Sequence, residues 1–158
     1  MKHSSIRDSL IGTWQLVSYE AHDAQGNISE PLGKNSLGIL CYTTDGFMSL
    51  QVMRKDRPGY SSTDLHVSLT EEMAAAASGY VAYAGRFSVD EAAATVTHHV
   101  QLSSSPPWIG TDQTRTVALR AGRLRATAWA SRLATRCVGL SVALGKAWHS
   151  DPSALMCW

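Results

Sequence analysis

The feature that most limits the fold of this chain is the two-residue turn Asp45-Gly46 between two apolar segments. Residues 37–42 and 47–53 flank the turn and are rich in the side chains typical of strands. An Asp-Gly pair readily adopts the positive φ angles of the tightest hairpin turns, which join antiparallel strands. The turn therefore predicts a hairpin and favours an antiparallel sheet.

Further short segments with strand character follow at hairpin spacing. They cover residues 13–20, 80–89, 95–102, 112–119 and 124–129. Many short strands separated by turns are typical of an all-β sandwich or barrel. We expect an antiparallel β-barrel, because closing the sheet removes its exposed edges.

One short helix is predicted near residues 69–78. Ser68 is suited to the N-cap, and Glu71 and Glu72 complement the positive end of the helix dipole. Gly79 follows as a typical helix stop. The sequence therefore predicts an all-β protein that carries a single short α-helix.

The regions outside these elements are less regular. Residues 54–67 are polar and are expected to form a long loop, while residues 130–158 form an atypical tail. Within the tail, residues 136–148 alternate as a closing strand would. With 158 residues in total, we expect residues 1–158 to form a single domain.

Composition argues against several classes of protein. A net charge of +1 gives no reason to expect nucleic acid or an anionic membrane. Cys41, Cys137 and Cys157 lie at spacings that indicate neither a zinc site nor a disulfide framework. No run reaches membrane-spanning length, residues 1–7 lack a secretory signal, and no nucleotide-binding fingerprint occurs. We expect a cytoplasmic protein with no metal, no cofactor and no membrane partner.

Residues 98–115 contain the densest group of chemically capable side chains. His98 and His99 are adjacent on a predicted strand, so their side chains point to opposite faces. His98 shares its face with the apolar Val100 and Leu102, which favours His98 as the interior residue. A polar cavity would reverse this assignment.

His98 and Asp112 are the candidate catalytic residues. A histidine suits proton transfer at neutral pH, and a carboxylate can act as a general base or anchor a ligand. The alternatives are a hydrogen-bonded structural histidine and a carboxylate that caps a turn. Asp112 and Arg115 are three positions apart on a predicted strand, so they too face opposite sides.

The candidate ligand-binding residues are aromatic, cationic or imidazole side chains. They are Trp14, Tyr19, Tyr42, Tyr83, Arg86, His99, Trp108 and Arg115. Aromatic walls with hydroxyl groups suit an apolar ligand that carries oxygen. The alternative for each aromatic residue is ordinary packing in the barrel.

Four segments together resemble the lipocalin-like domain family: residues 12–20, 38–49, 83–87 and 98–115. The resemblance covers about residues 10–124, and beyond about Thr127 the sequence departs from the family pattern. It implies a small calycin-like barrel with a cavity for a small, mostly apolar molecule. By analogy with lipocalins, it also implies that Arg115 braces the barrel by stacking on Trp14, with a similar bracing role open to Arg86.

The resemblance leaves more than one function open. One is a cofactor-independent isomerase or cyclase of secondary metabolism, because some family members belong to such pathways. The alternative is a non-catalytic carrier of a small hydrophobic metabolite. A third hypothesis is an interaction protein that uses the basic C-terminal segment, in which a single acid, Asp151, accompanies Arg120, Arg123, Arg125, Arg132, Arg136 and Lys146. A homodimer is expected if the last strand leaves a barrel edge uncovered.

Overall fold

We describe the fold from a computed structural model, in which residues 5–23, 25–62, 70–120, 122–129 and 139–146 are described. The strands are β1 (Gly12–His22), β2 (Ile28–Ser29), β3 (Leu37–Tyr42), β4 (Phe47–Met53), β5 (Tyr80–Asp90), β6 (Thr95–Ser103), β7 (Asp112–Arg120), β8 (Arg123–Trp129) and β9 (Gly139–Lys146). The helices are α1 (Ile6–Leu10), α2 (Thr70–Ser78) and the 3-10 turn η1 (Pro106–Trp108).

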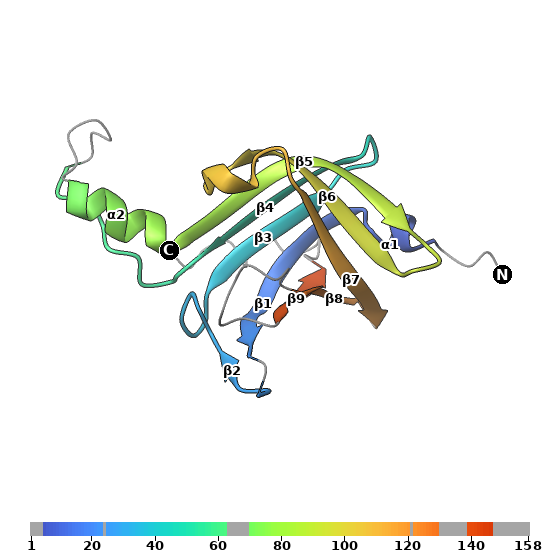
Figure 1. Cartoon of the computed structure of the whole chain (residues 1–158), viewed down its shortest axis with the longest axis horizontal. Coiled ribbons are helices and arrows are strands. Elements are labelled where there is room, and N and C mark those ends of the chain that lie inside the picture. The colour runs from blue at the N-terminus through green and yellow to red at the C-terminus, as the bar shows by residue number, and fades with distance from the viewer. Residues whose placement is uncertain (1–4, 24, 63–69, 121, 130–138, 147–158) are drawn as a thin grey trace, which may run out of the picture.

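The strands form one antiparallel sheet in the order β2-β1-β3-β4-β5-β6-β7-β8-β9 (Figure 1). An additional pairing of β1 with β9 closes every strand except β2 into a barrel. The predicted hairpin joins β3 to β4, but its turn is longer than the expected two residues: Gly46 takes a φ of 90° and donates its N–H to the Thr43 carbonyl at 3.1 Å, whereas Asp45 does not take a positive φ. The predicted antiparallel barrel is therefore confirmed.

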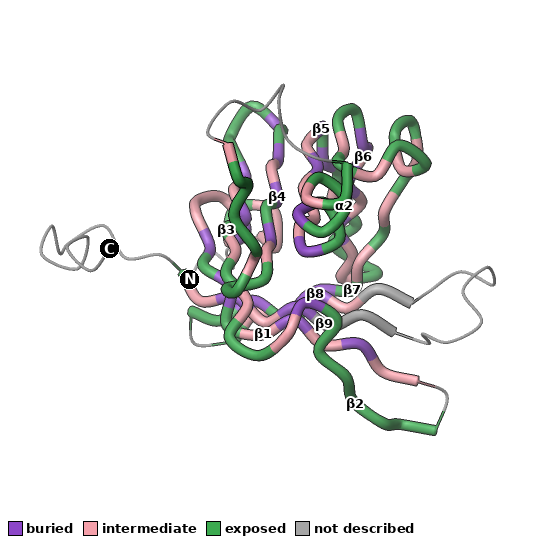
Figure 2. Tube along the Cα trace, turned by 90° about the vertical axis from the view of Figure 1, so that its left-hand side faces the viewer, coloured by how far each residue is buried: buried purple, intermediate pink, exposed green. Residues whose placement is uncertain are grey.

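Alternation along the strands builds the core. Leu40, Leu50, Val96 and Leu144 come from four different strands and are all buried on the inner side of the wall. Burying such a side chain contributes about 1.5–3 kcal/mol to folding. Figure 2 shows buried positions along the strands, whereas β2 and most of α2 are exposed.

The helix α1 was not predicted, and it packs near the turn that joins β5 to β6. Ser5 caps it by accepting a hydrogen bond from the backbone N–H of Asp8 at 3.0 Å. The Glu91 carboxylate accepts the backbone N–H groups of Ile6 and Arg7 at 2.8 and 3.0 Å. The carboxylate therefore satisfies N–H groups that a helix N-terminus leaves free. The sequence did contain a signal for the start of this helix, because Ser5 is a typical N-cap residue and lies three positions before Asp8.

Trp14 is fixed at the same end of the barrel. It is 1% exposed, and its indole Nε1–H donates to the carbonyl of Leu10 at 2.7 Å. The ammonium group of Lys146 lies 5.5 Å from the centre of the Trp14 ring. The expected stacking of Arg115 on Trp14 is therefore wrong, because Lys146 on β9 occupies that position.

A β-bulge interrupts the pairing of β5 with β6. Ala84 pairs with Leu102 and Gly85 pairs with Val100, so Gln101 is an extra residue on β6. The extra residue reverses the alternation, and Leu102 is 69% exposed. The expectation that Leu102 faces the interior is therefore wrong.

The strand β9 closes the barrel by pairing with both β1 and β8. The closing strand predicted at residues 136–148 is confirmed for residues 139–146, and its remaining residues lie outside the described part. This closure removes the open edge on which the homodimer prediction depended. Other predicted features also lie outside the described residues: the N-cap candidate Ser68, residues 63–67 of the predicted loop, and the cysteines Cys137 and Cys157.

The helix α2 covers Thr70–Ser78 and ends as expected, whereas residue 69, the predicted start, lies outside the described residues. It extends away from the barrel (Figure 1). No helix within the described ranges is long and apolar enough to cross a membrane.

Candidate ligand site in the barrel interior

The candidate site is centred on His98, which is buried together with the hydroxyl-bearing Tyr42 and Tyr83. His98 lies on the inner face of β6 and is 3% exposed. Its Nε2 shares a hydrogen bond of 2.7 Å with the Tyr42 hydroxyl, and its Nδ1 shares one of 2.9 Å with the Tyr83 hydroxyl. Three strands, β3, β5 and β6, therefore bring the three side chains into one chain of hydrogen bonds.

Burial keeps this chain uncharged. It lowers the pKa of His98 to about 3, and the nearby positive charge of Arg115 acts in the same direction. Burial also raises the pKa of the Tyr42 and Tyr83 hydroxyls. At neutral pH the cluster is a neutral imidazole between two neutral phenols.

The neutral imidazole gives the two hydroxyls different roles. One ring nitrogen donates and the other accepts, so one tyrosine accepts a hydrogen bond from His98 and the other donates one. The accepting tyrosine keeps its own O–H proton for a further acceptor, whereas the donating tyrosine has a lone pair left for a further donor. Exchanging the tautomer of His98 exchanges these roles.

Arg115 brings a positive charge to the interior side of β7. Its guanidinium donates to the Thr114 carbonyl at 3.0 Å and to the Gln113 side-chain oxygen at 3.3 Å. Gln113, Arg115 and Leu119 share a face with the buried Val117, yet all three are only half-buried. The interior beside this part of β7 is therefore accessible to solvent.

Aromatic rings enclose the cluster. Phe87 packs edge-on against Tyr42 with ring centres 4.8 Å apart, and Trp108 packs edge-on against Tyr83 at 5.7 Å. Trp108 is half-buried and belongs to η1, which follows the end of β6. The Pro-Pro segment thus places an aromatic side chain at the margin of the core, next to the tyrosine that contacts His98.

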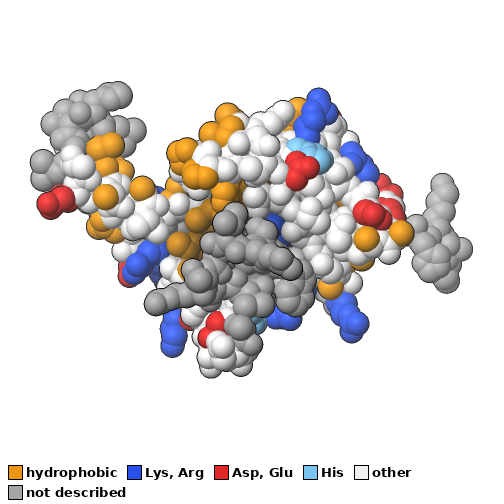
Figure 3. All heavy atoms as spheres, viewed as in Figure 1, with side chains coloured by type: hydrophobic (Ala, Val, Ile, Leu, Met, Phe, Trp, Pro, Cys, Tyr) orange, Lys and Arg blue, Asp and Glu red, His pale blue; other side chains and the backbone are white. Residues whose placement is uncertain are grey.

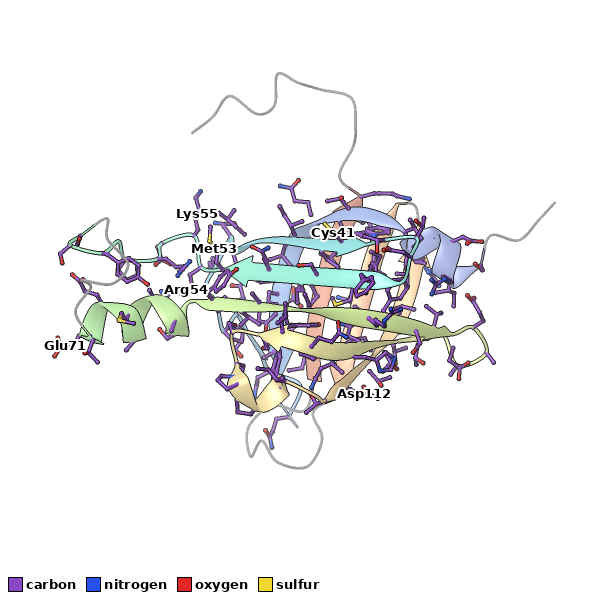
Figure 4. All side chains as sticks on the ribbon, turned by 90° about the horizontal axis from the view of Figure 1, so that it is seen from above. Cys41, Met53, Arg54, Lys55, Glu71 and Asp112 are labelled. Atoms are coloured by element: carbon purple, nitrogen blue, oxygen red, sulfur yellow. The ribbon has the colours of Figure 1, made fainter. Side chains whose placement is uncertain are left out.

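The barrel wall separates the remaining predicted residues from this cluster. His99, Asp112 and Arg86 are on the outer face: His99 bonds to Asp112 at 2.7 Å, and Arg86 lies over the Phe47 ring at 4.6 Å. Figure 4 labels Asp112 at the edge of the barrel. An interior site therefore excludes these three residues, and His98 and Asp112 do not act together. The barrel wall thus separates the two candidate catalytic residues, and a catalytic role for either one stays a prediction.

Two other predicted residues are buried in the core. Trp14 has its polar atom satisfied by Leu10, and Tyr19 is 8% exposed on β1. Both belong to the same apolar cluster as Tyr42 and Tyr83. Neither belongs to the hydrogen-bonded group of Tyr42, Tyr83 and His98, and a ligand contact of Trp14 or Tyr19 stays a prediction.

The described surface also has one hollow over β4, β5 and β6 and another over β1, β3 and β4. One, of about 320 Å³, is lined by Ser49, Leu50, Gln51, Tyr80, Ala82, Tyr83, Ala84, Leu102, Ser103, Ser104 and Ile109. The other, of about 310 Å³, is lined by Gln15, Leu16, Leu37, Gly38, Ile39, Gln51, Val52, Met53 and Tyr80. Tyr80 lines both hollows and donates a hydrogen bond to Gln51 at 3.2 Å. Most of their lining is on the outer side of the wall, so they are distinct from the interior beside β7.

Within the described residues, no three His, Cys, Asp or Glu side chains are grouped so that they could hold a metal ion.

Sequence reasoning missed Gln113 as part of the interior group. Gln113 pairs with His98 across β6 and β7, and its side chain accepts from Arg115. The signal was available, because Gln113 and Arg115 are two positions apart on a strand and so share a face.

A closed antiparallel barrel with a polar group in an otherwise apolar interior is the architecture of the lipocalin-like class. A model of the lipocalin-like domain matches residues 11–138, which is most of the chain. The chain belongs to the lipocalin-like domain family. The match continues beyond residue 124, so the expectation that the resemblance ends there was too narrow.

Two known proteins are similar to this chain. The 4'-hydroxy-3'-methoxypropiophenone carrier protein ppsC of Aspergillus oryzae (strain ATCC 42149 / RIB 40) is 42% identical over 79 residues, which cover 46% of this chain and 71% of that protein. The crystal structure of a lipocalin-like protein from Bacteroides uniformis ATCC 8492 has 16% identity and a TM-score of 0.46, covering 88% of this chain and 99% of that one.

Proposed function

We propose that this protein binds a small oxygenated aromatic molecule inside the barrel and acts as its carrier. The observation that carries the proposal is the convergence of His98, Tyr42, Tyr83 and Arg115 beside an interior that solvent can reach along β7. Few polar groups in apolar, aromatic surroundings are typical of small-molecule sites. The polar groups would orient the ligand, and the rings of Phe87 and Trp108 would contact its apolar part.

The chemistry of the cluster favours a ligand that carries both a carbonyl and a hydroxyl group. One tyrosine has a proton to donate and the other has a lone pair to accept with, so the pair matches an acceptor and a donor on one molecule. Arg115 would stabilise partial negative charge on a carbonyl or phenol oxygen. The name of the ppsC relative gives its cargo as a hydroxylated, methoxylated aryl ketone, which combines these groups.

A second candidate is a cofactor-independent isomerase or cyclase, and the hydrogen-bond chain favours its proton-transfer step. If Tyr83 gives its proton to a ligand oxygen, His98 can pass its Nδ1 proton to Tyr83 and take the Tyr42 proton on Nε2. Tyr42 then takes a proton from the ligand, which balances the transfer and restores neutrality. A raised tyrosine pKa and a lowered histidine pKa suit such a relay of neutral groups.

Calorimetric titration with 4'-hydroxy-3'-methoxypropiophenone tests the proposal. We expect one ligand to bind per chain, and Y83F to weaken binding about 5- to 30-fold, since a lost hydrogen bond costs about 1–2 kcal/mol. Y80F is the matched control, because Tyr80 is three positions from the buried Tyr83 on β5 and therefore faces the outer side of the wall. Equal losses in Y83F and Y80F, or no binding by the unaltered protein, would contradict an interior site.

Recovering the ketone after incubation in D2O separates the two candidates. A carrier returns the ketone without deuterium on the carbon next to the carbonyl, beyond the level of buffer alone. A proton-transfer catalyst introduces deuterium there, and Y83F abolishes the excess.

The expected cytoplasmic location and the homodimer remain predictions.

A further inference from the structure

The outer wall carries a second chain of hydrogen bonds that the interior site does not use. Ser88 on β5, His99 on β6 and Asp112 on β7 lie on three neighbouring strands. The Ser88 hydroxyl and His99 Nε2 are 2.9 Å apart, and His99 Nδ1 and Asp112 Oδ1 are 2.7 Å apart. The side chains of His99 and Asp112 are 42% and 64% exposed, and Ser88 is exposed as well. Figure 3 shows a histidine beside an acidic side chain on this face.

We propose that Ser88, His99 and Asp112 form an esterolytic site on the outside of the barrel, specific for small activated esters such as aryl acetates. The connectivity is the one that activates a serine: hydroxyl to Nε2, and Nδ1 to carboxylate. In the His99 tautomer that carries its proton on Nδ1, Asp112 accepts the hydrogen bond of that proton, and Nε2 is left as the acceptor for the Ser88 hydroxyl. The same tautomer makes His99 the base that removes the serine proton.

The backbone fixes this arrangement. His99 is directly opposite Asp112 on β7 and directly opposite Arg86 on β5, and Ser88 is two residues beyond Arg86 on the same face. The bulge at Gln101 sets this pairing, and a slip of one residue would turn His99 towards the interior. The spacing is thus a property of the sheet and not of flexible loops.

The reaction is a balanced hydrolysis in two steps. The Ser88 oxygen attacks the ester carbonyl while its proton passes to His99 Nε2; the bond to the aryl oxygen then breaks, and His99 returns the proton to the leaving phenolate. In the second step water attacks the acyl-serine and gives its proton to His99. The acid is released, and the proton returns to the Ser88 oxygen.

The surroundings set the limits of this activity. Arg86 is the exposed cation nearest along the strand to Ser88, and its guanidinium lies over the Phe47 ring on β4 at 4.6 Å. It would have to turn towards Ser88 to stabilise the negative oxygen that develops on the carbonyl. The wall is open on this side, so the site would accept small esters with good leaving groups. General-base assistance of this kind accelerates a reaction by about 10²–10⁴-fold.

The test is hydrolysis of 4-nitrophenyl acetate by the full chain, with labelling by a fluorophosphonate probe read by peptide mass spectrometry. We expect S88A to reduce hydrolysis at least 10-fold, H99Q and D112N to reduce it as well, and the probe to modify Ser88. S49A is the matched control and keeps the full rate, because Ser49 is a serine on the outer face of the adjacent strand β4. Thermal unfolding of each variant verifies that the fold is retained.

Two results would overturn the proposal. Hydrolysis that survives S88A but is lost in H99Q would show that the imidazole attacks the ester by itself. Absence of probe on Ser88 in the unaltered protein would show that this hydroxyl is not activated. Neither result bears on the interior ligand site, because the barrel wall separates the two groups.

Discussion

Replacing Gly85 with alanine is expected to destabilise the protein by about 3 kcal/mol or more. A Cβ atom at this position would lie 1.9 Å from the backbone oxygen of His99 and 3.0 Å from the backbone nitrogen of Gln101. Both atoms belong to the bulged strand β6, so relieving the clash requires the backbone to move. Gly85 therefore permits the bulge that places His98 inside and Leu102 outside.

Chemical denaturation of G85A and the unaltered protein measures this effect. G59A is the matched control, because a Cβ on Gly59 meets no atom within 4 Å. We expect the free energy of unfolding of G59A to stay within about 1 kcal/mol of the unaltered protein. Similar values for G85A and G59A would show that the bulge does not require glycine.

The second large expected effect is a loss of stability in acid that depends on His98. Burial lowers the pKa of His98 from 6.5 to about 3 in the folded state. Between these values the unfolded chain binds a proton that the folded chain does not, so the free energy of unfolding falls as pH falls. The slope is about 1.4 kcal/mol per pH unit, and the full loss is on the order of 5 kcal/mol by pH 3.

Denaturation at several pH values between 6.5 and 3 checks this prediction. H98F removes the titrating group, so its stability should fall less steeply with acid than that of the unaltered protein. The groups that face His98 are Tyr42, Tyr83 and Arg115, none of which changes charge in this range as an ordinary tyrosine or arginine. Parallel pH profiles for H98F and the unaltered protein would contradict the assignment.

Local patterns predicted the barrel well because they rest on short-range physics. The structure contains the predicted hairpin between residues 37–42 and 47–53, although its turn is longer than two residues. It also shows the alternation that separates His98 from His99 and the alternation that separates Asp112 from Arg115. The bulge was not predictable in the same way, because Gln101 carries no local signal for an extra residue. The cation over Trp14 was also missed, because it comes from β9, more than a hundred residues away.

In the candidate site too, individual residues were predicted from the sequence, but their arrangement in space was not. Tyr42, Tyr83, Trp108 and Arg115 were each proposed as ligand contacts, but their meeting around His98 depends on the register of strands far apart in sequence. His99, Asp112 and Arg86 were grouped with them because they are close along the chain or share a chemical type. Strand alternation and barrel closure place those three outside.

A ligand held inside the barrel by the hydrogen bonds of His98 should be visible at that side chain. The most direct measurement is ¹⁵N NMR of the histidine side chains during titration with 4'-hydroxy-3'-methoxypropiophenone, with H98F used to assign the His98 signals. Binding is expected to shift the Nδ1 and Nε2 resonances of His98, because the ligand competes for or extends its bonds to Tyr83 and Tyr42. Ligand binding that leaves both His98 resonances unchanged would contradict an interior site built on His98.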